Sequence, residues 1–169
     1  MASDPISRLI DQWKRERPDL DASPMGLVGR VLRLAVLLER RVEATLARFD
    51  LTLWQFDVLA TLRRSGKPYR LSPTQLMREV MLSSGAMTNR IDRLESRGLV
   101  KRCPEPADRR SVQIELTPEG KRLVDRAIAA RFEEAREVTR FIGAHDRDLL
   151  ERGLSRLLLA LEEQTSAPP

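Results

Sequence analysis

The chain has 169 residues, enough for one domain or for a small domain with an extension. It is 41% hydrophobic and 33% charged, as a globular protein is, and its formal net charge is +5. A single cysteine excludes an internal disulfide, and a single histidine argues against His-dependent catalysis or a metal cluster. Without an apolar run long enough to span a membrane or a signal-peptide core, the sequence indicates a cytoplasmic binding protein with a polyanionic partner.

Helices dominate the first half of the sequence. A short helix is predicted over residues 3–15, where Ile6, Leu9, Ile10 and Trp13 form one apolar stripe. Next comes a long helix over 24–48, opened by Ser23 as N-cap and by Pro24 at its first position. Its apolar face is wide enough to indicate burial on two sides, as at a dimer interface. Further helices are predicted over 53–64, 73–80 and 84–97, with a loop over 65–70, a capping box at Ser72 and Gln75, and a left-handed stop at Gly98.

The periodicity changes after Gly98. Residues 99–104 and 111–117 are predicted to be two strands, because Val112, Ile114 and Leu116 alternate with polar residues in the second. Thr117 and Pro118 then indicate the start of a long helix that extends to Ile142 and ends at Gly143, and a last helix is predicted over 146–163.

Two short helices followed by a hairpin form the pattern of a winged helix-turn-helix. Met87, Ile91 and Leu94 lie at helical spacing and are expected to face the core. The opposite face carries small polar residues and an arginine, which suit close approach to base edges in a major groove. Candidate DNA-binding residues are therefore Ser84, Thr88, Asn89 and Arg93 on the helix, with Arg109 and Arg110 at the tip of the hairpin.

The segment from SSGAMTNRIDRL through the DRRS turn to LTPEG strongly resembles the winged helix of the MarR family of bacterial regulators. The resemblance covers about residues 27–163 and implies a mainly α fold with a small β-hairpin. It also implies a homodimer that reads a pseudo-palindromic double-stranded operator, with half-sites about 10 bp apart. In this family the wing arginine, here Arg110, enters the minor groove, and Asp108 orients it.

The resemblance also implies a role for each segment of the chain. Residues 1–22 would form an extra N-terminal helix and linker, and 23–50 a dimerisation helix. Residues 51–117 would form the DNA-binding lobe, and 118–169 the C-terminal dimerisation helices.

Charged residues lie in unusual places, and the residues alone favour a structural ion pair of Asp57 that holds the DNA-binding lobe to the dimerisation helices. Asp57 has mostly apolar helix neighbours and needs a partner, whereas Arg90 lies beside the core stripe of its helix. Together with Arg102 at the start of the hairpin, Arg90 offers paired donors to a planar anion. With Trp13 on the extra helix, this set resembles the urate-responsive branch of the MarR family (the PecS, HucR and MftR type). That resemblance implies a repressor, without a cofactor, that urate or a related purine anion releases from DNA.

Other functions stay open on sequence alone. The same arginines suit a phenolic or other aromatic acid, and oxidation of Cys103 is a further candidate signal. An enzyme would need a nucleophile with a base or paired catalytic carboxylates, for which the sequence offers no candidate. A helical interaction module without DNA binding is disfavoured by the DRRS turn.

Overall fold

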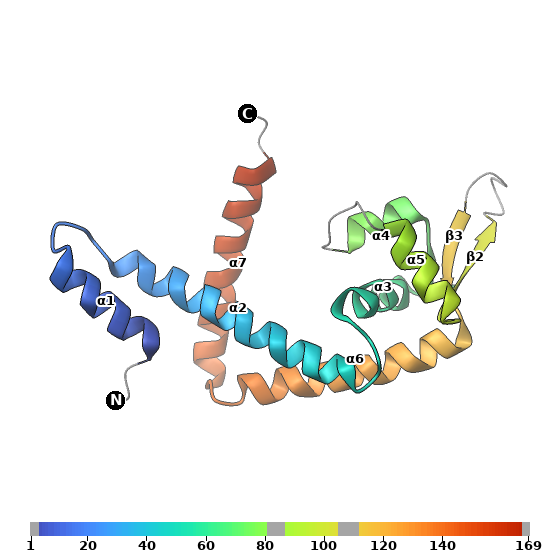
Figure 1. Ribbon diagram of the computed structural model, residues 1–169, viewed down its shortest axis with the longest axis horizontal. Helices are drawn as coiled ribbons and strands as arrows, with labels where there is room; N and C mark the ends of the chain where they lie inside the picture. The colour runs from blue at the N-terminus through green and yellow to red at the C-terminus, as the bar shows by residue number, and fades with distance from the viewer. Residues whose placement is uncertain (1–3, 81–86, 105–111, 167–169) are drawn as a thin grey trace. The chain divides into compact units, whose positions relative to one another are not determined.

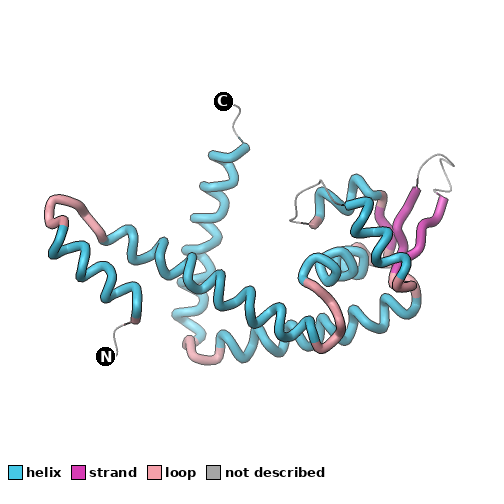
Figure 2. The backbone as a smooth tube through the Cα atoms, in the orientation of Figure 1, coloured by secondary structure: helices cyan, strands magenta, loops and turns pink. Residues whose placement is uncertain are grey.

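A computed structural model describes residues 4–80, 87–104 and 112–166 of the chain (Figure 1). Over these residues the chain is mainly helical, with one small antiparallel sheet, as expected (Figure 2). It divides into two compact units, residues 1–128 and 129–169, which are described separately below.

Helix α1 (Pro5–Glu16) packs on α2 (Ser23–Ala47) within the first unit. The Asp4 carboxylate caps α1 by accepting the Ile6 and Ser7 N–H groups, and it also pairs with Arg30 of α2 at 2.7 Å. Close packing is possible because α2 has a glycine, Gly29, where Ile6 approaches. The tertiary contact between α1 and α2 therefore combines a charged cap with an apolar contact.

The start of α2 differs from the prediction. Ala22 is the N-cap residue and Ser23 is already helical. The Asp21 carboxylate accepts the backbone N–H and the hydroxyl of Ser23. Asp21, just before the helix, therefore accepts an N–H group at the start of α2. The sequence had predicted this capping role for Ser23.

Helix α3 (Leu53–Arg64) begins and ends where the sequence predicted. The capping box that opens α4 (Pro73–Glu79) is confirmed, because Ser72 and Gln75 exchange side-chain hydrogen bonds with each other's backbone N–H groups. Helix α5 (Met87–Ser96) buries Met87, Ile91 and Leu94, so its predicted core face is also confirmed.

The sheet contains β1 (Arg70–Leu71), β2 (Val100–Pro104) and β3 (Val112–Leu116) in the order β1-β3-β2. The two hairpin strands were predicted, but β1 lies at the end of a segment predicted to be a loop. Two residues cannot show an alternating pattern, and only pairing with Glu115 and Ile114 of β3 makes this segment a strand. Gly98, with φ of +68°, turns the chain from α5 into β2, as expected.

Helix α6 (Pro118–Thr139) begins in the first unit, where the Thr117 hydroxyl accepts the Gly120 N–H. The prediction that α6 extends to Ile142 was wrong, because a turn in which Ile142 N–H donates to the Thr139 carbonyl follows the helix. Helix α7 (Ala144–Ser166) completes the second unit. Among the described residues, no helix is long and apolar enough to cross a membrane.

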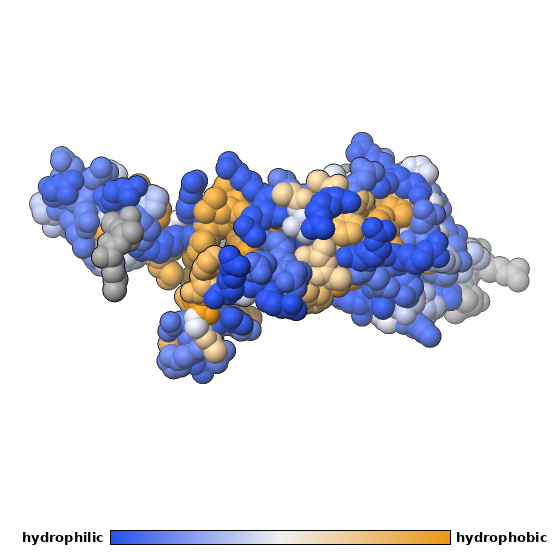
Figure 3. Space-filling model, turned by 90° about the horizontal axis from the view of Figure 1, so that it is seen from below, coloured by the Kyte–Doolittle hydropathy of each residue, from blue (hydrophilic) through white to orange (hydrophobic). Residues whose placement is uncertain are grey.

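Large apolar side chains remain exposed on the long helices, and apolar residues (orange) gather at the surface of the face shown in Figure 3. On α7 they include Leu154, Leu157, Leu158 and Leu161, which share one face by their spacing of three and four residues. On α2 they include Leu27, Leu34 and Leu38. Exposed apolar faces of this extent mark interaction surfaces.

Candidate DNA-binding and effector site

The outer face of α5 presents the polar side chains predicted to read DNA. Thr88, Asn89 and Arg93 are all exposed, opposite the three residues that α5 buries. Among the described residues, no ion pair involves Arg93, so its guanidinium is available to an external acceptor. Ser84, Asp108, Arg109 and Arg110 lie outside the described residues.

Acidic residues on the same helix are paired with an arginine of the hairpin strand β2. Arg102 of β2 pairs with Asp92 at 2.6 Å and forms a second ion pair with Glu95, whose carboxylate also accepts the Arg102 backbone N–H. The Asp92 carboxylate raises the pKa of the Arg102 guanidinium, so the arginine stays charged. These contacts tie β2 to α5 and offset the negative charge that would oppose a DNA phosphate.

A second charge cluster crosses the sheet. Glu115 of β3 lies between Lys101, 3.0 Å from its carboxylate, and Arg70, at 3.6 Å. A hydrogen bond to this carboxylate raises the pKa of the Lys101 ammonium. Cys103 is half-buried beside the cluster, with its Sγ 3.7 Å from the Glu115 carboxylate. The Glu115 carboxylate of β3 therefore pairs with one basic residue from each neighbouring strand.

Arg90 points inward from α5, as its position beside the core stripe predicted. Its guanidinium lies over the Trp54 ring of α3, 5.7 Å from the ring centroid. One of its terminal nitrogens, Nη1, is buried without a hydrogen-bond partner among the described residues. Asp57, which is half-buried, follows Trp54 by three residues and so lies on the same side of α3.

The four candidate effector residues are not all brought together within the described chain. Arg90 is placed against the face of α3 that carries Asp57, whereas Arg102 lies on another side of α5 with Asp92 and Glu95. Trp13 is 50% exposed on α1, and the ring that Arg90 covers is that of Trp54 rather than that of Trp13. In this structure, the defined contact at the candidate site is that of Arg90 with Trp54, one turn of α3 from Asp57.

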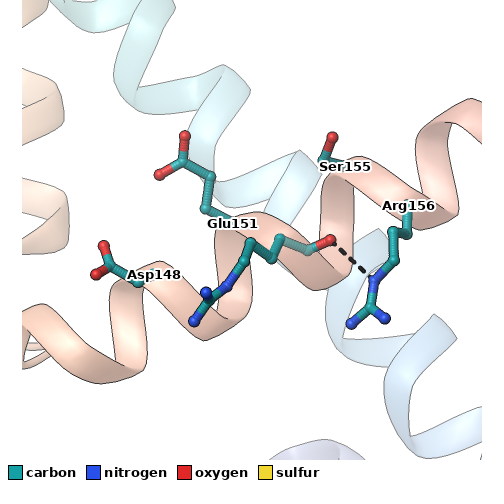
Figure 4. A pocket seen from close by; sticks show the side chains of 5 residues that line it. Asp148, Glu151, Ser155 and Arg156 are labelled. Carbon is teal, nitrogen blue, oxygen red and sulfur yellow. Dashed lines mark hydrogen bonds between the residues drawn. The ribbon is translucent and has the colours of Figure 1, made fainter.

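Two surface hollows lie elsewhere. One is lined along α7 by charged and polar side chains, among which the Nε of Arg156 donates to the Arg152 carbonyl at 3.4 Å (Figure 4). The other lies between α3 and α4, where Arg64 donates to the Glu79 carbonyl at 2.7 Å and also faces the Glu79 carboxylate. Both hollows mix acidic with basic side chains, so neither favours one class of ligand.

Comparison with known proteins explains this arrangement. A sequence model of the MarR family matches residues 49–111. The transcriptional regulator PecS of Dickeya dadantii is 41% identical over 79% of this chain and 80% of its own length. MarR of Salmonella typhimurium is 30% identical over 71% of this chain and 82% of its own. The chain belongs to the MarR family.

Solved structures of MarR proteins share the fold. A mutant MarR of Escherichia coli in complex with operator DNA covers 92% of this chain with a TM-score of 0.67 and 26% identity, matching 99% of that protein. Bordetella bronchiseptica BpsR, whose DNA binding is regulated by 6-hydroxynicotinic acid, covers 83% of this chain and 94% of its own, with a TM-score of 0.63 and 25% identity. This MarR protein is a winged helix-turn-helix, DNA-binding transcription regulator and not an enzyme.

Sequence reasoning missed several partners of the candidate residues. Trp54, one of the apolar helix neighbours of Asp57, was not identified as a partner of Arg90, although its spacing of three residues from Asp57 placed both on one helix face. Asp92 and Glu95, the partners of Arg102, share a face of α5 by the same spacing. What the sequence does not reveal is that β2 returns along that face.

Proposed function

We propose that this MarR protein binds a pseudo-palindromic operator as a homodimer, represses transcription, and is released by urate or a related purine anion. The roles of the segments follow from this. Residues 51–117 form the DNA-binding lobe, 23–50 and 118–169 supply the dimer contacts, and 1–22 add the N-terminal helix and its linker. A repressor works where its operator is, so the proposal places the chain in the cytoplasm.

For DNA, the proposal assigns base reading to the outer face of α5. Thr88, Asn89 and Arg93 are exposed there, and the pairing of Arg102 with Asp92 and Glu95 reduces repulsion of the backbone phosphates. Ser84 extends this reading surface, and Arg110 enters the minor groove with Asp108 and Arg109 beside it. Replacing Arg110 with alanine should therefore weaken DNA binding sharply in a gel shift, and unchanged binding would contradict the assignment of the wing.

For the effector, the observation that carries the proposal is the buried Nη1 of Arg90. A buried donor without a partner costs free energy, and a bound anion would supply the missing acceptor. An anion arriving beside Arg90 would also disfavour the nearby charge of Asp57. Because Arg90 is part of α5, a shift of its side chain would move the reading helix. The similarity to PecS supports urate, since the set Trp13, Asp57, Arg90 and Arg102 was assigned to the PecS type on sequence.

An aromatic acid is the second candidate effector. BpsR shares the fold, and 6-hydroxynicotinic acid regulates its DNA binding. The same arginine would serve either anion, because both are planar and carry oxygen acceptors. The two effectors are separated by comparing the affinity of urate with that of salicylate and 6-hydroxynicotinate. No described contact of Cys103 favours oxidation as the signal.

The test pairs two arginines of α5 that lie one turn apart and differ in burial, since Arg90 is half-buried and Arg93 is exposed. Urate is titrated by calorimetry into the wild type, Arg90→Ala and Arg93→Ala, and DNA binding of each is measured in parallel. Arg90→Ala should abolish urate binding and keep DNA binding, whereas Arg93→Ala should weaken DNA binding and keep urate. Urate binding that survives Arg90→Ala would move the pocket elsewhere, and a wild type that binds no urate would remove urate as the effector.

A further inference from the structure

The Asp125 carboxylate joins α3 to α6. The Asp125 carboxylate accepts from Arg63, near the end of α3, at 2.6 Å, and from Lys121 at 2.8 Å through its other oxygen. Lys121 and Asp125 are one turn apart on α6. The Arg63–Asp125 pair therefore links two helices whose buried faces belong to the same core.

The ring of Tyr69 completes the same cluster. Arg63 lies 4.9 Å and Lys121 5.9 Å from its centroid, so both cations that bind Asp125 also contact the aromatic ring. The Tyr69 carbonyl accepts the Leu116 N–H at 3.1 Å, which ties this residue to β3. Tyr69 has φ of +63°, a conformation that strains any residue with a Cβ and persists only where the surroundings hold it.

We propose that Arg63, Tyr69, Lys121 and Asp125, the α3–α6 bracket, fix the direction in which α6 leaves the DNA-binding lobe and thereby set the half-site spacing that the dimer accepts. These four are positioning residues that do not touch DNA. The inference rests on the proposed dimeric DNA binding and adds to it the part of the lobe that sets operator spacing.

The length of α6 makes its starting direction important. The helix has 22 residues, which corresponds to roughly 33 Å at the rise of an α-helix. A change of about 10° at its first turn would displace its far end by about 6 Å, nearly the length of two base-pair steps at 3.4 Å each. The ion pairs of the bracket are partly exposed and contribute little to the stability of the fold. Their expected effect is therefore on geometry more than on folding.

The experiment measures how affinity depends on spacing. A duplex of about 30 bp, long enough for two half-sites one turn apart, is selected from a randomised library with the wild-type protein, and versions with one base pair added or removed between the half-sites are prepared. Affinities are measured by fluorescence anisotropy for the wild type and Asp125→Asn. The wild type should bind the selected spacing at least about tenfold more tightly than either altered spacing, whereas in Asp125→Asn this preference should fall to about threefold or less.

Three further variants separate positioning from general stability. Glu133→Gln removes an exposed ion pair with Arg136 within one turn of α6 and should keep the wild-type spacing preference. Tyr69→Phe keeps the ring face and should also keep the wild-type spacing preference. Tyr69→Gly relieves the backbone strain but removes the ring, so it should lower the spacing preference.

The outcomes distinguish the two levels of proposal. If Asp125→Asn lowers the affinity for every spacing by the same factor, so that the spacing preference is unchanged, the proposed role of the bracket is wrong. The proposed function would still stand. A wild type that selects no duplex would overturn the proposed function, and the bracket with it.

Discussion

Gly120 lies where the first turn of α6 passes the backbone at the start of β2. A Cβ added at this position would lie 1.9 Å from the Leu99 carbonyl oxygen, so the backbone would have to move. The LTPEG motif is explained by this contact, together with the Thr117 cap that precedes it. A glycine that usually weakens a helix is required here by packing.

Gly120→Ala should therefore destabilise the protein, by about 1–3 kcal/mol, as overpacking typically does. The control is Gly153→Ala within α7, where an added Cβ meets nothing within 4 Å. That change should be neutral or stabilising by up to about 1 kcal/mol, because alanine favours helix. Urea unfolding of the wild type and both variants at one protein concentration measures the change in the free energy of unfolding for each variant. Equal changes for the two variants would contradict the packing argument.

The charge of Asp4 holds α1 against α2. The Arg30 guanidinium, and next the Ser7 N–H, keep the pKa of the Asp4 carboxyl well below its usual range. Because the folded state lowers this pKa, the stabilisation is complete above the ordinary aspartate pKa of about 3.9. It is lost as the pH falls through that value towards the lower folded pKa.

Acidification should therefore release α1 from α2. The emission of Trp13, recorded in a Trp54→Phe background, should shift to longer wavelength as the pH falls below about 4. Asp4→Asn keeps a capping side chain but removes the charge, so its emission should already be shifted at neutral pH. Asp19→Asn, which breaks only the pair with Arg17 in the linker, should follow the parent. Identical curves for all three proteins would show that the Arg30 pair does not hold α1.

At the scale of elements, local signals predicted most of the fold. The capping residues Ser72 and Thr117 located α4 and α6, and the spacing of Met87, Ile91 and Leu94 located the core face of α5. The cap of α2 and the end of α6 were mispredicted at local contacts, whereas two other features were missed because they depend on contacts distant in sequence. β1 exists only through its pairing with β3, and the acidic partners of Arg102 became evident only once β2 was placed along α5.

The candidate effector site shows the same limit. Sequence placed Arg90 beside the core stripe of its helix, and the structure brings its guanidinium onto Trp54, one turn from Asp57. Sequence did not reveal that Arg102 has two carboxylates as partners in the same lobe. An anion that binds Arg102 must therefore compete with Asp92 and Glu95.

This competition predicts that Asp92→Asn strengthens effector binding. Removing one carboxylate from Arg102 should tighten urate binding by about 3–10-fold, the effect of roughly 1 kcal/mol from a partly exposed ion pair. Asp50→Asn is the matched control, because it releases Arg97 in the same lobe and Arg97 is outside the candidate site. Calorimetry measures both affinities. If Asp92→Asn binds urate no more tightly than the control, Arg102 ties the wing to α5 without binding the effector.

At the scale of the whole molecule, the two units leave apolar surface unburied within one chain. Phe132 and Phe141 of the second unit are exposed together with the leucine face of α7. In the first unit, leucines are also exposed on α2. A monomer rarely exposes this many large apolar side chains on its helices, and a second copy of the chain is the occupant that the proposed homodimer supplies.

Leu158→Glu tests that arrangement. Leu158 is 53% exposed on the leucine face of α7, and a carboxylate there would have to be desolvated in a dimer interface. Light scattering should find the wild type at twice the chain mass of 19.3 kDa and the variant at that mass. Operator affinity should fall by about 100-fold or more, because one lobe binds without the effective concentration that the second supplies.

Arg156→Glu places the same side chain on the opposite side of α7 and should remain dimeric. A dimeric Leu158→Glu with full operator affinity would show that the leucine face of α7 does not form the dimer, and would leave α2 as the surface to alter next.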